Sequence, residues 1–371
     1  MDPRGQPGLA PARRLSAIDV VRGTFMITIL AGHAASNFNH WPSSHAVEDV
    51  LGPFFQSGTV GFSVVSGTLL GSFAATRPDM TPILRRYRTQ GIRLLTVAHV
   101  LIALALYPPL HREGTSFLRF LALRLYVTDI LAILFLAVAP FVPRVRPKTR
   151  LGLGIGALIA LRIVRAAIWG TDTPSLLARE ILGGVSFQAP RHVLIDNYAL
   201  LSITGMFLIG TFIGDVIGRA RLRGELREAA RGLVRAAMII QAFTLALIGI
   251  YAVFKLGVLP DPGGGARRAF YPERSGAFFP AYLGFVLALL AIALRRDASG
   301  EPLTLGERAL EVVGKTSLFS YVVQYVLVQT LPHAVGLQRQ MTPTVMAAWT
   351  AASIAIVVGL AALWNRHVKR A

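Results

Sequence analysis

Three polar side chains within the first apolar segment have a spacing that suits proton-transfer chemistry. Arg22 and His33 are 11 residues apart, which on a helix is about 1100°, roughly 20° past three whole turns, so they share a face. Asp19 precedes Arg22 by one helical turn, where the two side chains can pair. Ionisable groups at membrane depth are costly unless they face a cavity. We therefore interpret His33 as a general base and Arg22 and Asp19 as the residues that position it or the donor.

A structural role for the same histidine stays open, because intramembrane histidines often only hydrogen-bond a neighbouring helix. Other kinds of chemistry have no support in the sequence. The chain has no cysteine, which excludes disulfides, thiolate metal sites and a cysteine nucleophile. Its histidines are scattered without a metal-binding spacing, and it has neither a P-loop nor a dinucleotide-binding fingerprint in a βαβ context. We expect no metal.

A basic run precedes the third apolar segment and consists of Arg85, Arg86, Arg88 and Arg93. Arginine binds phosphates through forked hydrogen bonds, and Arg86 and Arg93 are two turns apart on one helical face. Anionic lipid headgroups would explain the same run. In the preceding segment, Gly67 and Gly71 would allow another backbone to approach closely, and we expect Ser66 beside them to line a site.

Further polar residues fall on the opposite side of the membrane and suit a sugar, through hydrogen bonds and stacking. The candidates are Asn37, Trp41, Arg191, His192 and Asp196. Tyr321 and Gln324 share one face of a late apolar segment (i, i+3) and either line a cavity or bridge helices. Asp129, inside the fourth apolar segment, is expected to pair with an arginine because a buried carboxylate needs a partner.

The composition places these residues in a membrane protein. Of 371 residues, 53% are hydrophobic and 15% are charged, against roughly 25% charged in soluble domains. Apolar stretches long enough to span a bilayer lie at 18–38, 50–75, 91–110, 118–141, 150–169, 193–217, 233–255, 277–295, 312–331 and 343–364. The sequence therefore predicts an all-α integral membrane protein of about ten transmembrane helices with a central polar cavity.

The distribution of basic residues predicts the orientation of these helices. Lys and Arg number 25 in the loops on the side of the N-terminus and eight in the loops on the other side. By the positive-inside rule both termini are cytoplasmic, in the cell (plasma or inner) membrane. The net charge of +19 follows this topology and does not indicate a nucleic-acid partner. We expect a disordered tail at 1–15, a transmembrane domain at 16–366 and a basic tail at 367–371, and a cleaved first segment is the less favoured alternative.

Four stretches of the chain together resemble the transmembrane acyltransferase superfamily. They are Ile18–Gly23 followed by His33, the glycine-rich stretch Gly61–Gly71, the basic run Arg85–Leu95, and the late motif Gly314–Tyr321. The first matches the family pattern of a basic residue, ten residues and a histidine. The superfamily includes acyltransferase-3 proteins, succinyltransferases of periplasmic glucans and the heparan-glucosaminide N-acetyltransferase.

The resemblance implies an enzyme of the cell envelope that modifies a glycan. Cytoplasmic acyl-coenzyme A, either acetyl-CoA or succinyl-CoA, would be the donor, bound by the arginines of the basic run. A hydroxyl or amine of an extracytoplasmic glycan or glycolipid would be the acceptor, activated by His33. A homodimer is compatible with this interpretation. The alternative is a multi-pass transporter or flippase, which ten helices with intramembrane charges would also fit, although no paired, Gly/Pro-interrupted helices mark two repeats.

Overall fold

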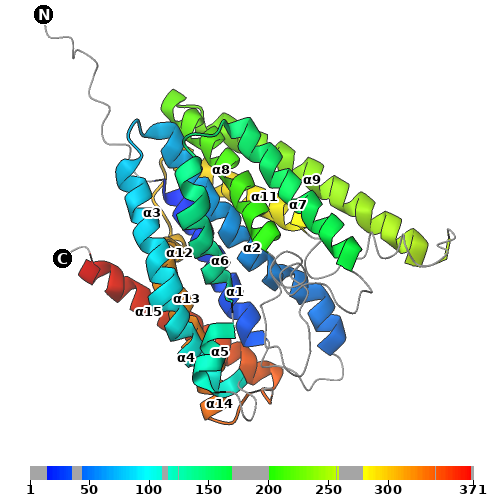
Figure 1. Cartoon of the computed structure of the whole chain (residues 1–371), viewed down its shortest axis with the longest axis vertical. Helices are drawn as coiled ribbons and strands as arrows, with labels where there is room; N and C mark the ends of the chain where they lie inside the picture. The colour runs from blue at the N-terminus through cyan, green and yellow to red at the C-terminus, as the bar shows by residue number, and fades with distance from the viewer. Residues whose placement is uncertain are drawn as a thin grey trace, which may run out of the picture.

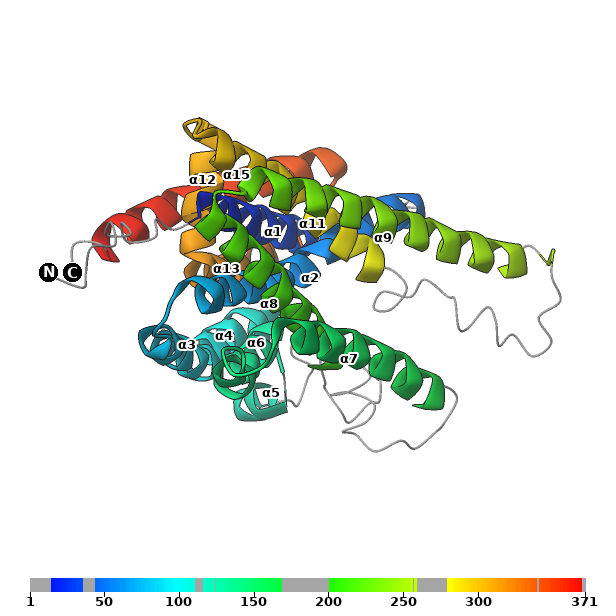
Figure 2. The ribbon, with the colours of Figure 1, turned by 90° about the horizontal axis from the view of Figure 1, so that it is seen from above.

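The fold is a bundle of helices with α1 at its centre. The computed structural model describes residues 15–35, 44–110, 116–123, 125–168, 200–255, 257–258, 279–338 and 340–368, and these residues contain no strand. Figures 1 and 2 show α1 surrounded by α2, α11, α12, α13 and α15, and α1 is in contact with each of these helices. The predicted all-α class is confirmed.

Half of the α-helices among the described residues are long enough on their own to cross a bilayer, at 1.5 Å of rise per residue. The longer ones are α1 (Ser16–Ala35), α2 (Ser44–Thr76), α7 (Pro147–Ile168), α8 (Leu200–Arg223), α9 (Leu226–Lys255), α11 (Phe279–Ser299) and α15 (Pro343–Val368). The shorter ones are α3 (Thr81–Arg93), α4 (His99–Leu110), α5 (Phe117–Leu123), α6 (Val127–Ile133), α12 (Leu305–Lys315), α13 (Ser317–Tyr325) and α14 (Leu331–Ala334). A π-helical turn at Leu94–Ala98 joins α3 to α4 without a break.

Seven helices among the described residues are both long and apolar enough to span a membrane, so the chain is a multi-pass membrane protein. The other three predicted spans also fall on helices. The fourth is divided between α5 and α6, and the ninth is divided at Thr316 between α12 and α13. The fifth coincides with α7, whose side chains beyond Ile163 lie outside the described residues. The orientation of the termini stays a prediction.

Glycines set the distance between α2 and α8. A Cβ at Gly67 would lie 2.1 Å from the Phe207 carbonyl oxygen, and one at Gly71 would lie 2.0 Å from that of Thr211. Gly210 on α8 is equally close to the backbone of α2. These distances allow no side chain, so the predicted small-residue packing is confirmed. The crossing holds Ser66, one residue before Gly67, in the middle of the bundle.

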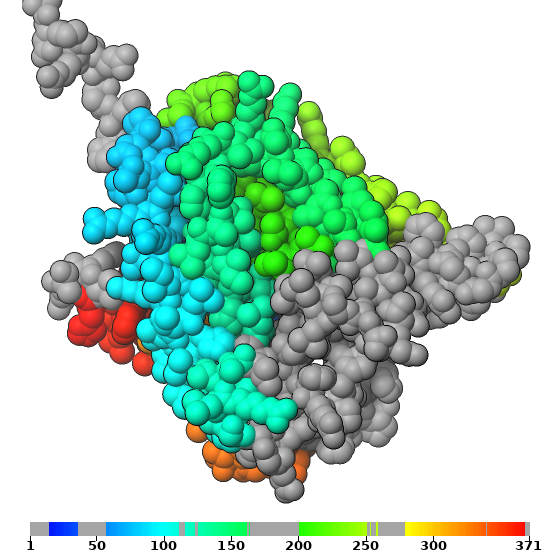
Figure 3. Space-filling model, viewed as in Figure 1, coloured from blue at the N-terminus to red at the C-terminus, as the bar shows by residue number. Residues whose placement is uncertain are grey.

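The outer surface of the bundle is apolar, as a lipid environment requires. Large aliphatic side chains are exposed on α3–α4 and α7, including Val97, Leu104, Ile159 and Ile163. Figure 3 shows α3, α4, α6 and α7 covering much of one face of the molecule. Exposed aliphatic side chains over whole helices indicate a partner less polar than water. Inside, two clusters of buried apolar residues form the core.

Candidate active site

A cavity lies among α1, α2, α3, α6 and the junction of α12 with α13. Its polar lining residues are Arg22, Thr59, Ser66, Arg86, Tyr87, Gln90, Thr128, Lys315, Ser317 and Tyr321, and the rest are aliphatic or Phe. Four residues predicted from the sequence for the site, Arg22, Ser66, Arg86 and Tyr321, therefore line one cavity. They come from four different helices, which only the packing of the bundle brings together.

The positive charges of the cavity gather near one end. Arg22 lies beside Gly314, the neighbour of Lys315, in the first third of α1. From Arg22 the cavity follows α1 for seven residues to Ile29, about 10 Å at 1.5 Å per residue. The lining residues nearer that deep end, including Thr59 and Val127, carry no charge. The cavity is therefore cationic at the end near Arg22, which we call its mouth, and uncharged at the end near Ile29, which we call its deep end.

Arg22 joins α1 to the break between α12 and α13. Its Nε donates a hydrogen bond to the Gly314 carbonyl oxygen at 2.7 Å, and one of its terminal nitrogens bonds the same oxygen. The same guanidinium lies 3.5 Å from the Asp19 carboxylate, which is fully buried. The predicted Asp19–Arg22 pair is therefore present, and its arginine lines the cavity at the mouth.

The start of α12 is defined by a capping box. Glu307 Oε2 accepts hydrogen bonds from the Thr304 hydroxyl and backbone N–H, while the Thr304 hydroxyl accepts from the Glu307 N–H. The bonds from Thr304, together with Arg296 at 2.8 Å, hold the pKa of Glu307 below its ordinary value. This cap and ion pair fix the register of α12, whose other end carries Gly314 and Lys315.

Replacing Gly314 by alanine is expected to destabilise the protein and displace Arg22. A Cβ at Gly314 would lie 1.9 Å from the Asp19 carbonyl oxygen, so α1 and α12 must separate. Forced overpacking of this kind costs about 1–3 kcal/mol. A lowered melting temperature in detergent checks this prediction. Gly306→Ala on the same helix is the control, because a Cβ there meets nothing within 4 Å; equal melting temperatures for the two variants would contradict the close crossing.

A pair of tyrosines connects the cavity to His33. The Tyr321 hydroxyl, whose residue lines the cavity, lies 3.0 Å from the Tyr325 hydroxyl. The Tyr325 ring packs against the His33 ring with centroids 4.9 Å apart. Gln329 donates a hydrogen bond to the His33 carbonyl oxygen at 3.3 Å. His33 itself is half-buried and is not among the lining residues, but it lies one helical turn beyond Ile29 at the deep end.

Several predicted site residues lie elsewhere. Arg85, Arg88 and Arg93 are exposed on α3, outside the cavity lining. Gln324 is fully buried beside the cavity but does not line it, and its side-chain amide has no hydrogen-bond partner among the described residues. The predicted acceptor residues Asn37, Trp41, Arg191, His192 and Asp196 lie outside the described residues.

The prediction that Asp129 pairs with an arginine is wrong. Its Oδ2 lies 2.8 Å from His99 Nδ1 and accepts a hydrogen bond from the Tyr126 backbone N–H at 2.7 Å. His99 Nε2 lies 3.0 Å from the Leu121 carbonyl oxygen. Asp129 therefore caps the start of α6 and connects it to α4. The break between α5 and α6 frees the Tyr126 N–H group that the carboxylate satisfies, and no proline or glycine lies at this break to predict it.

Three residues of the site have roles that the sequence analysis did not assign: Lys315, Thr128 and Tyr325. Lys315 lines the cavity and bonds Glu311 at 2.7 Å. The buried Thr128 hydroxyl also lines it and has no hydrogen-bond partner among the described residues. Tyr325 follows Tyr321 by one turn, and this i, i+4 spacing was the available signal for it. Among the described residues no group of His, Cys, Asp or Glu could hold a metal ion.

Comparison with known proteins shows the family to which the chain belongs. A family model described as an acyltransferase domain, that of the acyltransferase-3 family, matches residues 15–364. No curated protein matches the chain. The match runs from the first residue of the described structure to the last turns of α15, so it includes every helix that lines the cavity.

Proposed function

Because the chain belongs to the acyltransferase-3 family, we propose that it moves an acetyl or succinyl group from cytoplasmic acyl-CoA to an extracytoplasmic glycan or glycolipid. The observation that carries this proposal is the cavity, which is cationic at one end and neutral at the other, with His33 one turn beyond its deep end. A molecule with phosphates at one end and an uncharged thioester at the other matches this order of charges. We also propose that the protein lies in the cell membrane with both termini in the cytoplasm.

The donor would enter by the cationic mouth. Arg86 and Lys315 would bond the anionic part of coenzyme A, since charge-assisted bonds to phosphate are the stronger kind. Arg86 is the more available of the two, because it forms no ion pair with a described residue, whereas Lys315 is shared with Glu311. The exposed Arg85, Arg88 and Arg93 on the same helix would contact the nucleotide where it emerges.

At the deep end the reaction would be a direct acyl transfer. His33 would take the proton from the acceptor hydroxyl or amine. At the same time the acceptor oxygen or nitrogen would form a bond to the carbonyl carbon of the thioester. The carbon–sulfur bond then breaks, and coenzyme A leaves as the thiol after taking up a proton. The unpartnered Thr128 hydroxyl is suited to donate a hydrogen bond to the carbonyl oxygen, where negative charge develops. The acceptor would be held by Asn37, Trp41, Arg191, His192 and Asp196 on the outer side, and by Tyr321 and Gln324.

Arg86→Gln and Lys315→Gln are each expected to raise the KM for acetyl-CoA by about 10- to 100-fold with little change in kcat. One lost charge-assisted hydrogen bond is worth about 1.5–3 kcal/mol, and the chemistry at the deep end is left intact. Release of free coenzyme A from acetyl-CoA measures both constants. Arg227→Gln is the matched control, because Arg227 is an exposed arginine of α9 outside the lining. The same KM in all four proteins would contradict donor binding at this mouth.

Tyr325→Phe is expected to lower kcat about fivefold and to leave the KM for acetyl-CoA unchanged. The substitution keeps the ring that packs against His33 and removes only the hydroxyl bonded to Tyr321, a loss of about 1 kcal/mol. A bell-shaped pH profile of kcat that shifts in the variant would show that the hydroxyl acts through His33. If kcat and its pH profile were unchanged in the variant, the tyrosine pair would have only a packing role.

A further inference from the structure

A second hollow lies between the start of α7 and the second half of α8. It is lined by Arg146, Pro147, Lys148, Thr149, Phe212, Asp215 and Arg219. None of these residues lines the active-site cavity. Three cationic side chains and one phenyl ring around one hollow suggest a ligand that is negatively charged and partly apolar.

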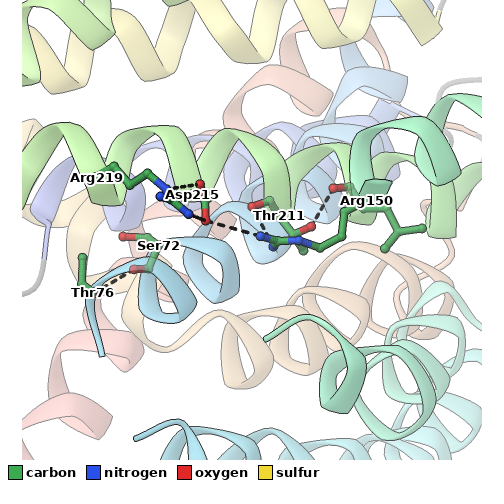
Figure 4. Close-up of polar contacts among 7 residues, drawn as sticks. Ser72, Thr76, Arg150, Thr211, Asp215 and Arg219 are labelled. Atoms are coloured by element: carbon green, nitrogen blue, oxygen red, sulfur yellow. Dashed lines mark hydrogen bonds and ion pairs between the residues drawn. The ribbon is translucent and has the colours of Figure 1, made fainter. Parts of the chain in front are cut away.

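The floor of the hollow is fixed by a buried ion pair. Arg150, only 3% exposed, donates hydrogen bonds to the Thr211 carbonyl oxygen at 3.2 Å and to Asp215 Oδ1 at 3.4 Å. Arg219 approaches from the other side and bonds Asp215 Oδ2 at 2.7 Å. Figure 4 shows the Asp215 carboxylate between the two guanidinium groups. The one carboxylate of the hollow is therefore already neutralised by two arginines.

The remaining two cations, Arg146 and Lys148, have no counter-charge among the described residues. Arg146 and Lys148 are exposed, and neither forms an ion pair or a side-chain hydrogen bond with any residue that the structure describes. Arg146, Lys148, Arg150 and Arg219 thus face a single carboxylate. Like charges held this close repel one another, so an anion in the hollow would be bound favourably.

The predicted topology places the hollow where the membrane meets water on the cytoplasmic side. It is at the start of α7 and near the end of α8, on the side of the bundle that the basic loops predict to be cytoplasmic. Apolar side chains next to it in both helices are exposed, with Leu153 55%, Val216 37% and Leu222 54% accessible. Chains of a lipid whose headgroup sat in the hollow would cover these side chains.

We propose that this hollow binds the phosphate group of an anionic phospholipid. Arg146 and Lys148 would bond the phosphate oxygens, and Arg219, oriented by Asp215, would complete the contact. The acyl chains would run along the exposed aliphatic side chains of α7 and α8. Basic pockets between transmembrane helices on the cytoplasmic side are suited to such headgroups because each basic residue near an anionic surface contributes about 1 kcal/mol.

The test is the binding of short-chain phosphatidylglycerol to the full-length protein in neutral detergent, measured by microscale thermophoresis. The double variant Arg146→Gln with Lys148→Gln should weaken binding about thirtyfold, which corresponds to two contributions of about 1 kcal/mol each. Both side chains are exposed, so the variant should keep the wild-type melting temperature. Arg227→Gln with Arg235→Gln removes the same net charge from exposed positions of α9 and should bind like the wild type.

Two comparison ligands identify the source of the phosphate. Short-chain phosphatidylcholine should bind much more weakly, and millimolar inorganic phosphate should not displace phosphatidylglycerol. Equal affinity of the wild type and the Arg146, Lys148 variant would overturn the proposal, as would equal binding of the two lipids. Complete displacement by inorganic phosphate would also overturn it, because the hollow would then be a site for a free anion.

Discussion

Replacing His33 by alanine is expected to lower the turnover of acetyl-CoA by about 10²–10⁴, the usual contribution of a positioned general base, while acetyl-CoA still binds. Binding should survive because the cavity mouth at Arg22 lies about three helical turns along α1 from His33. Turnover should fall because His33 is the histidine that lies next to the deep end of the cavity, packed on Tyr325. Equilibrium binding and release of free coenzyme A, measured on the same preparation, separate the two effects.

A second histidine variant tests whether removing an imidazole ring elsewhere in the protein also lowers turnover. His333 is exposed on α14, with Nδ1 2.7 Å from Gln338 Oε1, and His333→Ala should turn over acetyl-CoA at the wild-type rate. If His33→Ala retained wild-type turnover with intact folding, His33 would have only the helix-bridging role that intramembrane histidines often have.

Replacing Asp215 by asparagine is expected to lower the free energy of unfolding by about 3–5 kcal/mol. The substitution keeps the shape of the side chain but leaves the buried Arg150 without a carboxylate, and an uncompensated buried charge carries this cost. Arg150 cannot reach water in place, since its side chain is 3% exposed. Unfolding in mixed micelles, followed by circular dichroism, measures the change.

A double variant shows whether the charge is the cause. Arg150→Met combined with Asp215→Asn removes both charges and should recover a large part of the loss, because apolar replacement of a whole buried pair is often close to neutral. Arg219→Gln should cost less than about 1 kcal/mol, since the Arg219 side chain is 56% exposed. If the Asp215→Asn variant were as stable as the wild type, water or another group would have to compensate the charge of Arg150.

The helices could be predicted from the sequence because long apolar runs indicate membrane spans and basic clusters indicate the loops between them. All ten predicted spans coincide at least in part with described helices, and Gly67 and Gly71 allow the expected close approach of another backbone, that of α8. The breaks at Thr316 and between Leu123 and Val127 were not predicted. Neither has a proline or glycine within it to mark it, and each is stabilised by contacts with distant helices, such as Arg22 with Gly314 and His99 with Asp129.

The site could be predicted only in part, for a related reason. Helical periodicity places Asp19 and Arg22 together, and family motifs indicate Ser66, Arg86 and Tyr321, which the structure brings to one cavity. Periodicity does not show which faces of different helices meet. It therefore could not distinguish Arg86, which lines the cavity, from Arg85 and Arg88 beside it, nor could it find Lys315 or Thr128. Asp129 was assigned an arginine partner because the histidine that it contacts is 30 residues away on another helix.

The most direct test of the proposed function is whether the detergent-purified protein binds and turns over acyl-CoA. Acetyl-CoA and succinyl-CoA are titrated into the wild type and His33→Ala, and release of free coenzyme A is followed. We expect saturable binding by both proteins, with turnover by the wild type alone. If the well-folded wild type bound neither acyl-CoA, the donor assignment would be wrong, and a transport function would become the better explanation of a polar cavity within this bundle.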